Sequence, residues 1–349
     1  MTKTTWAEVV TRTEIVMPRE GGPEVLETHR RELPAPGPGQ AVVRVEATGV
    51  SFAEVQMLKG RYFGQPRFPF VPGYDLVGEI ESVGEGVEGG LIGTRVAALT
   101  QTGAWADRVA LAARDMAPVP DVLDPADAVA VVTNGVTAWQ MLHRAARVGP
   151  GQTVLVHGAS GGVGTLLVQL ARLAGADVIG TASARKHDYV RTLGAVPVDY
   201  RGDVPARVRE IAPDGVDAVF DHVGGPGLVD SYRMLRRGGT LVTYGSASTL
   251  DGTGHWIRPY LPIFARVLRW NATPDGKRAT FYYVKRWPTF FQEDLSTVLS
   301  LLADGTVEAH ATTRMPLESA AEALGLLASG KASGKVVLVP GPGAQQSAR

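Results

Sequence analysis

A cluster of glycines between an apolar segment and an amphipathic segment is the part of this 349-residue sequence best suited to binding an anion. The stretch VLVHGASGGVGTLLVQLARL, residues 154–173, places Gly158, Gly161 and Gly164 three residues apart, with Gly162 between them. Glycines let backbone amides approach a phosphate, and the start of a helix adds free N–H groups and a positive dipole end. We therefore expect a turn that binds the phosphates of a dinucleotide; a tight turn that binds nothing is the alternative.

Strands and helices alternate around this cluster. The helix expected after it has one apolar face, formed by Val163, Leu166, Leu167, Leu170, Ala171 and Ala174. Strand-like segments recur from about residue 131 onward: Thr153–His157, Asp177–Thr181, Pro197–Tyr200, Val216–Asp221, Thr240–Tyr244 and Thr280–Val284. Helical patterns separate most of them, so the sequence predicts an α/β region with right-handed βαβ units and a parallel sheet.

The rest of the chain follows two other patterns. Residues 11 to about 130 contain short β-like runs broken by Pro and Gly, such as QAVVRVEATGV, LVGEIESVGEGV and GTRVAALT, which predict an irregular barrel-like domain. Beyond about residue 290 we expect a helix in EDLSTVLSLLADG, a second helix at Glu318–Ser329 and a strand in KVVLVP. The tail after Pro340 is expected to be flexible.

Composition excludes several classes of function. Apolar residues make up 44% and charged residues 20%, as in an ordinary globular protein, and 35 basic residues balance 35 acidic ones, so neither nucleic acid nor an anionic membrane is an expected partner. No apolar run approaches the length of a membrane span. The absence of cysteine excludes disulfides, thiolate zinc sites, iron–sulfur clusters and a cysteine nucleophile. We expect a cytoplasmic protein.

The end of the second strand of the α/β region distinguishes between cofactors. In NAD-binding domains an acidic residue at this point binds the adenosine ribose. Here the segment reads Thr181, Ala182, Ser183, Ala184, Arg185 and Lys186, and the first acid is Asp188. Hydroxyls and two cations suit a 2′-phosphate, so the sequence predicts NADPH. Alternatively, Arg185 and Lys186 begin a solvated helix face.

Motifs along most of the chain resemble a known family. They are, in order, GGPEVLE, PGPGQAVVRVEATGVSFAEV, PGYDLVGEIESVGEGV, VHGASGGVG, LGA, VDAVFDHVGG, GGTLVTYG and SGKVVLVP. They resemble the zinc-free quinone oxidoreductases of the medium-chain dehydrogenase/reductase superfamily, and GTASARKH and VTYGSAS most resemble the vesicle amine transport protein subgroup. The resemblance implies a GroES-like β-barrel domain, residues 1–130 plus 290–349, with an inserted doubly wound Rossmann domain, residues 131–289.

The resemblance also implies positions for the cofactor. The pyrophosphate would lie at Gly158, Ala159, Ser160, Gly161, Gly162, Val163 and Gly164, and the 2′-phosphate near Thr181, Ser183, Arg185, Lys186 and Tyr200. Asn134 and Thr137 would line the nicotinamide side, and Val223, Gly245 and Ser246 follow strands that usually touch the cofactor. Phe281, Tyr282 and Lys335 are further candidates, for which packing is an alternative.

The positions of metal ligands are altered relative to zinc-dependent relatives. Those relatives carry Gly-His-Glu where this chain has Gly73-Tyr74-Asp75, and a Cys where it has Ser51. The seven histidines show no ligand spacing, and His157 and His222, at strand ends, are expected to be satisfied structural residues. The sequence therefore predicts no catalytic zinc.

The absence of zinc favours an acceptor whose reduced form is a delocalised anion. No tyrosine has a lysine four places on, the pattern with which short-chain reductases protonate an alkoxide. A quinone or an α,β-unsaturated carbonyl spreads the charge and needs mainly orientation and a dry slot. Family position puts Ser51, Glu54, Gln56, Tyr62 and Tyr74 near that slot, with Tyr62 as the candidate to hydrogen-bond a carbonyl oxygen. Relatives usually have Asn at position 51, some have Tyr at position 56, and packing is an equal alternative for Tyr74.

Three functions remain open on the sequence alone. The first is an NADPH-dependent quinone or enone reductase; the second is an enoyl reductase acting on a polyketide or acyl thioester; the third is an NADPH-binding structural or interaction protein with little turnover. The aromatic segments HWIRPYLPIF and FYYVKRWPTFF would shape a large apolar pocket, or else form core or a dimer interface. We expect a homodimer, because the family commonly pairs Rossmann sheets edge to edge, with weak support from the apolar segment Leu261–Leu268.

Overall fold

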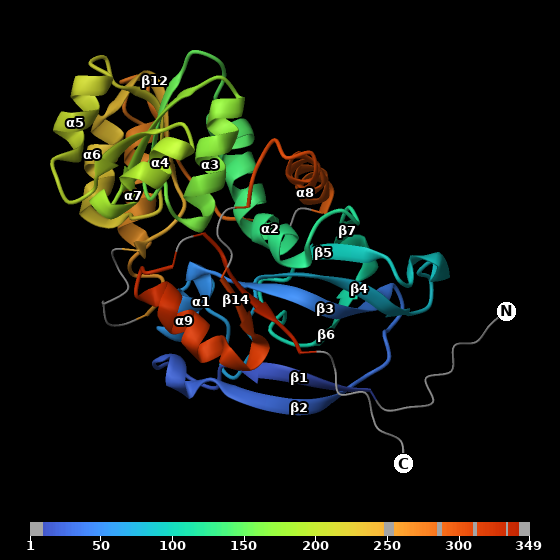
Figure 1. Ribbon diagram of the computed structural model, residues 1–349. Coiled ribbons are helices and arrows are strands. Elements are labelled where there is room, and N and C mark those ends of the chain that lie inside the picture. The colour runs from blue at the N-terminus through green and yellow to red at the C-terminus, as the bar shows by residue number, and fades with distance from the viewer. Residues whose placement is uncertain (1–9, 248–254, 285–287, 310–312, 333, 342–349) are drawn as a thin grey trace. The chain divides into compact units, whose positions relative to one another are not determined.

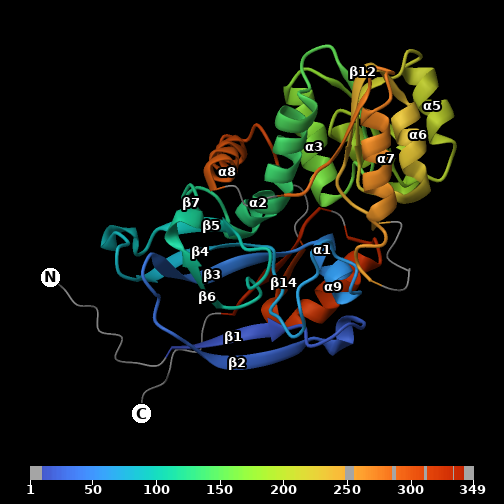
Figure 2. The same ribbon diagram turned by 180° about the vertical axis from the view of Figure 1, so that it is seen from behind.

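The computed structural model describes residues 10–247, 255–284, 288–309, 313–332 and 334–341. The chain forms two compact units, each shown in Figures 1 and 2. Unit 1 comprises residues 1–59, 66–133 and 286–349, and unit 2 comprises residues 60–65 and 134–285. Unit 2 therefore contains a short segment, 60–65, that comes from within the first part of the chain.

Unit 1 is built on a seven-stranded sheet in the order β14-β15-β3-β4-β5-β7, with β6 also paired to β3. Its strands are β3 (Gln40–Val50), β4 (Asp75–Val83), β5 (Arg95–Leu99), β6 (Arg108–Ala112), β7 (Met116–Pro118), β14 (Thr313–Pro316) and β15 (Val336–Val339). A separate antiparallel hairpin joins β1 (Val10–Val16) to β2 (Glu27–Leu33). Alternate residues of β3 and β4, among them Ala41, Val43, Leu76 and Ile80, are buried in one core, as expected for strands with one face inward.

The helices of unit 1 lie between and after these strands. They are α1 (Phe52–Leu58), most of α2 (Pro125–Trp139), α8 (Pro288–Ala303) and α9 (Ala320–Ala328). The three β-like runs predicted before residue 100 are confirmed as β3, β4 and β5. The helix predicted in EDLSTVLSLLADG begins earlier, at Pro288, and the one predicted at Glu318–Ser329 starts with a 3₁₀ turn, Leu317–Ser319. The predicted flexible tail lies, apart from Gly341, outside the described residues.

Unit 2 contains a six-stranded parallel sheet in the order β10-β9-β8-β11-β12-β13. Its strands are β8 (Thr153–Val156), β9 (Asp177–Ala182), β10 (Val196–Asp199), β11 (Val216–Asp221), β12 (Leu235–Thr243) and β13 (Arg278–Phe281). The chain forms β8, β9 and β10 outward in one direction and then returns to place β11, β12 and β13 on the other side. This is the doubly wound Rossmann order, whose ligands bind at the carboxyl ends of the strands near the reversal between β8 and β11.

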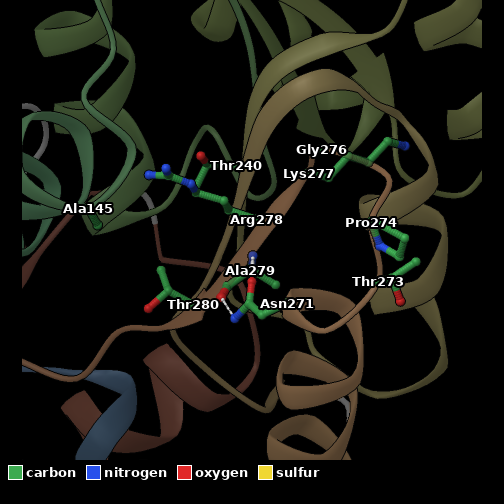
Figure 3. A pocket seen from close by; sticks show the side chains of 10 residues that line it. All are labelled: Ala145, Thr240, Asn271, Thr273, Pro274, Gly276, Lys277, Arg278, Ala279 and Thr280. Atoms are coloured by element: carbon green, nitrogen blue, oxygen red, sulfur yellow. Dashed lines mark hydrogen bonds between the residues drawn. The ribbon is translucent and has the colours of Figure 1, made fainter.

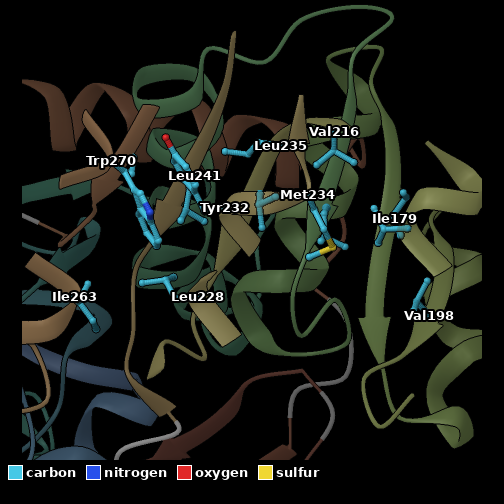
Figure 4. Packing of buried hydrophobic residues seen from close by; sticks show 14 of the residues in the cluster. Ile179, Val198, Val216, Leu228, Tyr232, Met234, Leu235, Leu241, Ile263 and Trp270 are labelled. Atoms are coloured by element: carbon cyan, nitrogen blue, oxygen red, sulfur yellow. The ribbon is translucent and has the colours of Figure 1, made fainter. Parts of the chain in front are cut away.

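The connecting helices of unit 2 are α3 (Gly162–Leu173), α4 (His187–Thr192), α5 (Val204–Ile211), α6 (Leu228–Arg233) and α7 (Leu261–Asn271), and a π-helical segment, Gln140–Ala146, continues α2. The apolar faces of α5, α6 and α7 pack with the sheet in one cluster, shown in part in Figure 4. Within it the rings of Tyr232 and Trp270 stack with centroids 4.3 Å apart. Burying these apolar side chains is the main source of stability for such a layer.

All six strands predicted for this region are confirmed, with two corrections at their ends. β12 begins at Leu235, five residues before the predicted start, and continues through Gly238 and Gly239. β13 ends at Phe281 and not at Val284. Tyr282 still donates a hydrogen bond to the Thr243 carbonyl, but pairing as a strand stops there. Among the described residues, no helix is both long enough and apolar enough to cross a membrane.

Candidate functional site

The turn between β8 and α3 is shaped by glycines that have no room for a side chain. Gly158 has a φ of +69°, and a Cβ on it would lie 2.5 Å from Cε1 of His222. A Cβ on Gly164 would lie 2.2 Å from the carbonyl oxygen of Gly158. The first turn of α3 therefore packs directly against the backbone of the turn, which is the close approach that the glycine spacing predicts.

The amino end of α3 has an open set of donors. Its N-cap is Gly161, so no side chain caps the helix. The first N–H groups of an α-helix have no partner within the helix and carry the positive end of its dipole. A Cβ on Gly162 would lie 2.5 Å from Nδ2 of Asn134, so the Asn134 amide is adjacent to these donors. Uncapped amides, an amide side chain and glycines at the points of contact fit a pyrophosphate.

The next two strands place the residues predicted for the 2′-phosphate beside one another. Asp199 of β10 is in register with Ala182 of β9, and the Tyr200 N–H donates to the Ala182 carbonyl over 3.3 Å. Ser183 and Tyr200 therefore follow the paired ends of adjacent strands. Tyr200 is 53% exposed.

Cations surround this edge of the sheet. Arg185 is exposed and Lys186 is half-buried. Desolvation, and secondly the charge of Arg185, lower the pKa of Lys186. Arg201, which the sequence prediction missed, holds its guanidinium 5.0 Å from the centre of the Tyr200 ring. Its position directly after Tyr200 was the available signal, because a basic residue one step beyond a predicted contact shares its edge of the sheet.

The ends of β11 and β12 lie close to the glycine turn. Val223 is 37% exposed, whereas Ser246 is buried. A Cβ on Gly245 would lie 2.5 Å from the carbonyl oxygen of His222, so the loop after β12 packs tightly on the loop after β11. Thr181, in contrast, is buried and accepts a hydrogen bond from the Gly158 N–H at 3.1 Å. It supports the turn from beneath.

The predicted nicotinamide-side residues of unit 2 fall into two groups. Asn134 and Thr137 are both buried on α2. Tyr282 donates from its hydroxyl to Oε1 of Gln140, 2.6 Å away, which ties the end of β13 to the π-helical segment. Phe281 is packed among aromatic rings, and the centroid of its ring is 5.6 Å from that of Phe63.

The segment 60–65 carries Tyr62 and Phe63 into these aromatic residues. The Tyr62 hydroxyl donates to the Tyr283 hydroxyl over 3.1 Å. The Phe63 ring meets several rings edge to face; they belong to Trp256, Tyr260, Phe264, Phe281 and Tyr283. Parts of the two aromatic segments singled out in the sequence thus pack together around Phe63.

In unit 1, Ser51 and Glu54 form a capping box at the start of α1. The N–H and the hydroxyl of Ser51 donate to Oε2 of Glu54, at 2.8 Å and 2.7 Å. Glu54 is fully buried, and its Oε1 has no hydrogen-bond partner among the described residues. Burial raises the pKa of Glu54 to about 7, against the opposing effect of the Ser51 hydrogen bond.

Next to this box lies an ion pair within the core of unit 1. Lys335 Nζ is 3.1 Å from Oδ2 of Asp75, and both side chains are buried. Asp75 also accepts hydrogen bonds from the Gly49 N–H at 3.0 Å and the Thr133 N–H at 3.3 Å. A Cβ on Gly49 would lie 2.2 Å from Cε of Lys335, so the ion pair lies directly against the backbone at Gly49.

The predicted catalytic residues divide between the units. Ser51, Gln56 and Tyr74 lie in unit 1 with Lys335, and Tyr62 lies in unit 2. Gln56 and Tyr74 are buried, while Ser51 is partly exposed. Their roles toward a substrate remain predictions.

The sequence predicts no metal site. Among the described residues, no group of three or more such side chains is placed to hold a metal ion. His310 lies outside the described residues. The expectation that both strand-end histidines are satisfied is wrong for His222, because its Nδ1 is buried and has no hydrogen-bond partner among the described residues. The edge of this ring lies against Gly158, where a side chain would have no room.

A pocket of about 710 Å³ lies beside β13, and none of its lining residues is a predicted cofactor residue (Figure 3). Asn271 forms one wall; its Nδ2 donates to the Ala279 carbonyl at 2.8 Å and its Oδ1 accepts from the Ala279 N–H at 2.9 Å. The amide side chain thus occupies the outer edge of β13 at Ala279.

Comparison with known proteins gives two matching family models. An alcohol dehydrogenase GroES-like domain matches residues 37–121, and a zinc-binding dehydrogenase domain matches residues 193–338. The synaptic vesicle membrane protein VAT-1 homolog of Homo sapiens is 33% identical over 328 residues, 91% of this chain and 83% of that protein. A mycocerosic acid synthase-like polyketide synthase of Mycobacterium tuberculosis is 33% identical over 340 residues, 95% of this chain but 15% of that protein.

Solved structures resemble the whole chain as well. A quinone oxidoreductase from Pseudomonas syringae is 30% identical with a TM-score of 0.83, and the match covers 94% of this chain and 100% of that one. A mycobacterial protein complexed with NADPH is 31% identical with a TM-score of 0.82, over 94% of this chain and 100% of that one. The fold thus has solved counterparts, one of them complexed with NADPH.

Proposed function

The chain belongs to the medium-chain dehydrogenase/reductase superfamily, in its quinone oxidoreductase family and VAT-1-like subgroup, and from that membership we propose that it is an NADPH-dependent reductase of quinones or α,β-unsaturated carbonyls. Membership makes it an oxidoreductase with a nicotinamide cofactor. The choice of NADPH and of a conjugated acceptor is our proposal.

The observation that carries the choice of NADPH is the edge formed by β9 and β10. Ser183 and Tyr200 follow paired strand ends, and Arg185, Lys186 and Arg201 add positive charge there. The sequence has no acid between Thr181 and Lys186 that would repel a 2′-phosphate. The mycobacterial relative complexed with NADPH supports the same choice.

The rest of the cofactor would lie along the strand ends of unit 2. We propose that the uncapped amides of α3 bind the pyrophosphate and that Asn134, Thr137, Val223, Gly245, Ser246, Phe281 and Tyr282 flank the nicotinamide half. When bound, NADPH supplies the hydride, and the protein supplies position and the exclusion of water.

We propose that the reaction needs no zinc. At the positions where zinc-dependent relatives hold the metal, the Ser51 hydroxyl donates to Glu54 and Tyr74 is a buried phenol. A thiolate–imidazole set is therefore replaced by groups that zinc binds poorly. Tyr62 would turn its hydroxyl proton from the Tyr283 hydroxyl to the acceptor's carbonyl oxygen. Ser51, Gln56 and Tyr74 would line the slot.

An enoyl thioester is the second candidate acceptor. The observation in its favour is the match of 95% of this chain to part of a polyketide synthase. An enoyl thioester is itself an α,β-unsaturated carbonyl, so the same hydride transfer applies.

One set of measurements on the purified protein tests the proposal. We expect NADPH to bind at least about tenfold more tightly than NADH, since a paired phosphate contributes on the order of 1.4 kcal/mol. NADPH oxidation should accelerate with quinones, enones or enoyl thioesters, and metal analysis should find no stoichiometric zinc. Equal affinities would contradict the choice of NADPH, and stoichiometric zinc would contradict the metal-free reaction. Tight binding without turnover of any acceptor would replace the reductase by an NADPH-binding protein.

We also propose a cytoplasmic homodimer. The exposed apolar side chains Leu261 and Leu268 on α7, 54% and 74% exposed, support an interface. Light scattering should give twice the chain mass of 36.9 kDa. A monomer mass would contradict the dimer.

A further inference from the structure

A continuous row of side-chain hydrogen bonds runs beneath the ends of β9, β8 and β11. Thr181 Oγ1 accepts from the Gly158 N–H at 3.1 Å and lies 3.3 Å from Nδ1 of His157. The other ring nitrogen, Nε2 of His157, is 3.1 Å from the Ser231 hydroxyl. Ser231 in turn donates to Oδ2 of Asp221 at 2.7 Å. We call Thr181, His157, Ser231 and Asp221 the polar chain.

The direction of each hydrogen bond follows from its ends. A backbone N–H only donates, so Thr181 accepts from Gly158 and turns its own proton to Nδ1 of His157. An ionised carboxylate only accepts, so Ser231 gives its proton to Asp221 and accepts from Nε2 of His157. The neutral His157 tautomer with its proton on Nε2 is therefore the form that satisfies both neighbours.

The charged and titratable groups around His157 agree with a neutral ring. Desolvation lowers the pKa of His157, and the nearby carboxylate of Asp221 opposes that effect. His222, which follows β11, also has its pKa lowered, mainly by desolvation. Thr181 and Ser231, which face the two ring nitrogens, are uncharged and buried.

The far end of the polar chain holds a second loop. Oδ1 of Asp221 accepts from the Val223 N–H at 2.8 Å and from the Gly224 N–H at 2.9 Å. One end of the polar chain is thus hydrogen-bonded to the glycine turn and the other end to the loop after β11. These are the two loops on either side of the strand-order reversal, where a dinucleotide binds in this type of sheet.

We propose that His157 and Ser231 are positioning residues for the cofactor, coupling the glycine turn at Gly158 to the loop at Val223 through the polar chain. The proposal rests on the cofactor site proposed above. Neither residue needs to touch the cofactor. Their effect is to keep the first-turn amides of α3 and the Val223 loop in one arrangement before binding, so that binding does not have to order them.

Breaking the chain at two separate links tests this coupling. We expect Thr181→Val and Ser231→Ala each to weaken NADPH binding about tenfold, as for the loss of a buried hydrogen bond. Thr181→Ser, which restores the hydroxyl, should recover most of the affinity that Thr181→Val loses. Thr192→Val is the matched control, because Thr192 donates only to the Tyr189 carbonyl on the exposed surface of α4. It should leave NADPH affinity unchanged.

The double variant gives the decisive comparison. If the polar chain couples the two loops, Thr181→Val and Ser231→Ala together should weaken NADPH binding far less than the product of the two single effects. A double variant whose loss of NADPH affinity equals the product of the two single losses would overturn the coupling. Nitrogen NMR of His157 supplies a readout independent of cofactor: the wild type should show the Nε2–H tautomer, and Ser231→Ala should shift the tautomer balance.

The two proposals fail separately. A wild-type protein that shows the Nε2–H tautomer but binds no NADPH would contradict the proposed function and leave the polar chain without a cofactor to position. A wild type that binds NADPH with His157 protonated on Nδ1 would overturn the direction of the hydrogen bonds in the polar chain, while the proposed function stands. If Ser231→Ala does not fold, Thr181→Val against Thr181→Ser still decides whether the chain affects affinity.

Discussion

Unit 1 neutralises its buried cation with a carboxylate, whereas unit 2 surrounds its buried carboxylate with neutral donors. In unit 1, Lys335 and Asp75 pair with each other inside the core, next to a Glu54 carboxyl with one oxygen that has no partner within the described ranges. In unit 2, Asp221 accepts two backbone N–H groups and the Ser231 hydroxyl. The first arrangement is closed on itself, while the second extends to loops with open backbone donors.

This difference separates stability from ligand binding. A buried ion pair costs much free energy when one partner is removed, because the other charge stays behind in a low dielectric. A network of neutral donors that supports loops contributes mainly by holding them in place. Changes in the unit 1 cluster should therefore appear as changes in unfolding, and changes around the unit 2 turn as changes in nucleotide affinity.

The largest expected effect is on the ion pair. Lys335→Met should lower the free energy of unfolding by about 3–5 kcal/mol, because Asp75 loses its cation while remaining buried. Denaturant unfolding measures the change. The exposed pair of Arg44 with Glu79 is the control, and Arg44→Met should cost less than about 1 kcal/mol. Equal costs for the two substitutions would remove the contrast between core and surface pairs.

Glu54 gives a pH-dependent test in the same unit. Its folded pKa, about 7, is above the ordinary 4.5, so the folded state holds this proton more tightly than the unfolded state. Stability from this group is present below pH 4.5 and is lost as pH rises toward 7, by about 3 kcal/mol. Glu54→Gln keeps the shape of the side chain but does not titrate. Between pH 5 and 8 the free energy of unfolding of the variant should therefore rise relative to that of the wild type, by about 3 kcal/mol. Parallel pH profiles of unfolding for the two proteins would contradict the raised pKa.

A matched pair of glycines compares the helices of the two units. Gly164→Ala on α3 places a Cβ against the Gly158 carbonyl and should weaken NADPH binding ten- to hundredfold, about 1–3 kcal/mol of misfit. Gly325→Ala on α9 meets no atom within 4 Å and should raise stability by about 0.5–1 kcal/mol. Fluorescence titration and thermal unfolding read out both variants. An unaffected Gly164→Ala protein would mean that the turn is not the nucleotide site.

The smallest effect is expected at Arg201. Arg201→Met should reduce NADPH affinity by about twofold to fivefold and leave NADH affinity unchanged, because an exposed cation contributes up to about 1 kcal/mol. Arg207→Met is the control, since Arg207 forms an ion pair with Glu210 on the exposed face of α5. An equal loss for both nucleotides would place Arg201 away from the 2′-phosphate.

Local patterns in the sequence were sufficient for the parallel sheet and the glycine turn. Strand-helix alternation identified all six strands of unit 2, and the spacing of Gly158 and Gly164 anticipated the close packing of α3 on the turn. Where the pattern was ambiguous the boundaries were wrong, as at Gly238 in β12, because a glycine within a strand looks like a turn.

Contacts between distant segments could not be predicted. Asp75 and Lys335 are 260 residues apart, and Phe63 meets rings from residues 256–283. The pKa of Glu54 depends on complete burial, which no local pattern encodes. The polar chain likewise joins three strand ends and α6, so His157 looked like an isolated residue in the sequence. Packing in three dimensions determines each of these.

The most direct test of the account is the transfer of a labelled hydride. The protein is mixed with NADPH carrying deuterium at the transferable position of the nicotinamide C4 and with an α,β-unsaturated ketone, and the product is examined by mass spectrometry and NMR. We predict one deuterium at the former β-carbon and a proton from water at the α-carbon, in metal-free buffer. A product without deuterium, or no product with any conjugated acceptor while NADPH is bound, would contradict the proposed reductase.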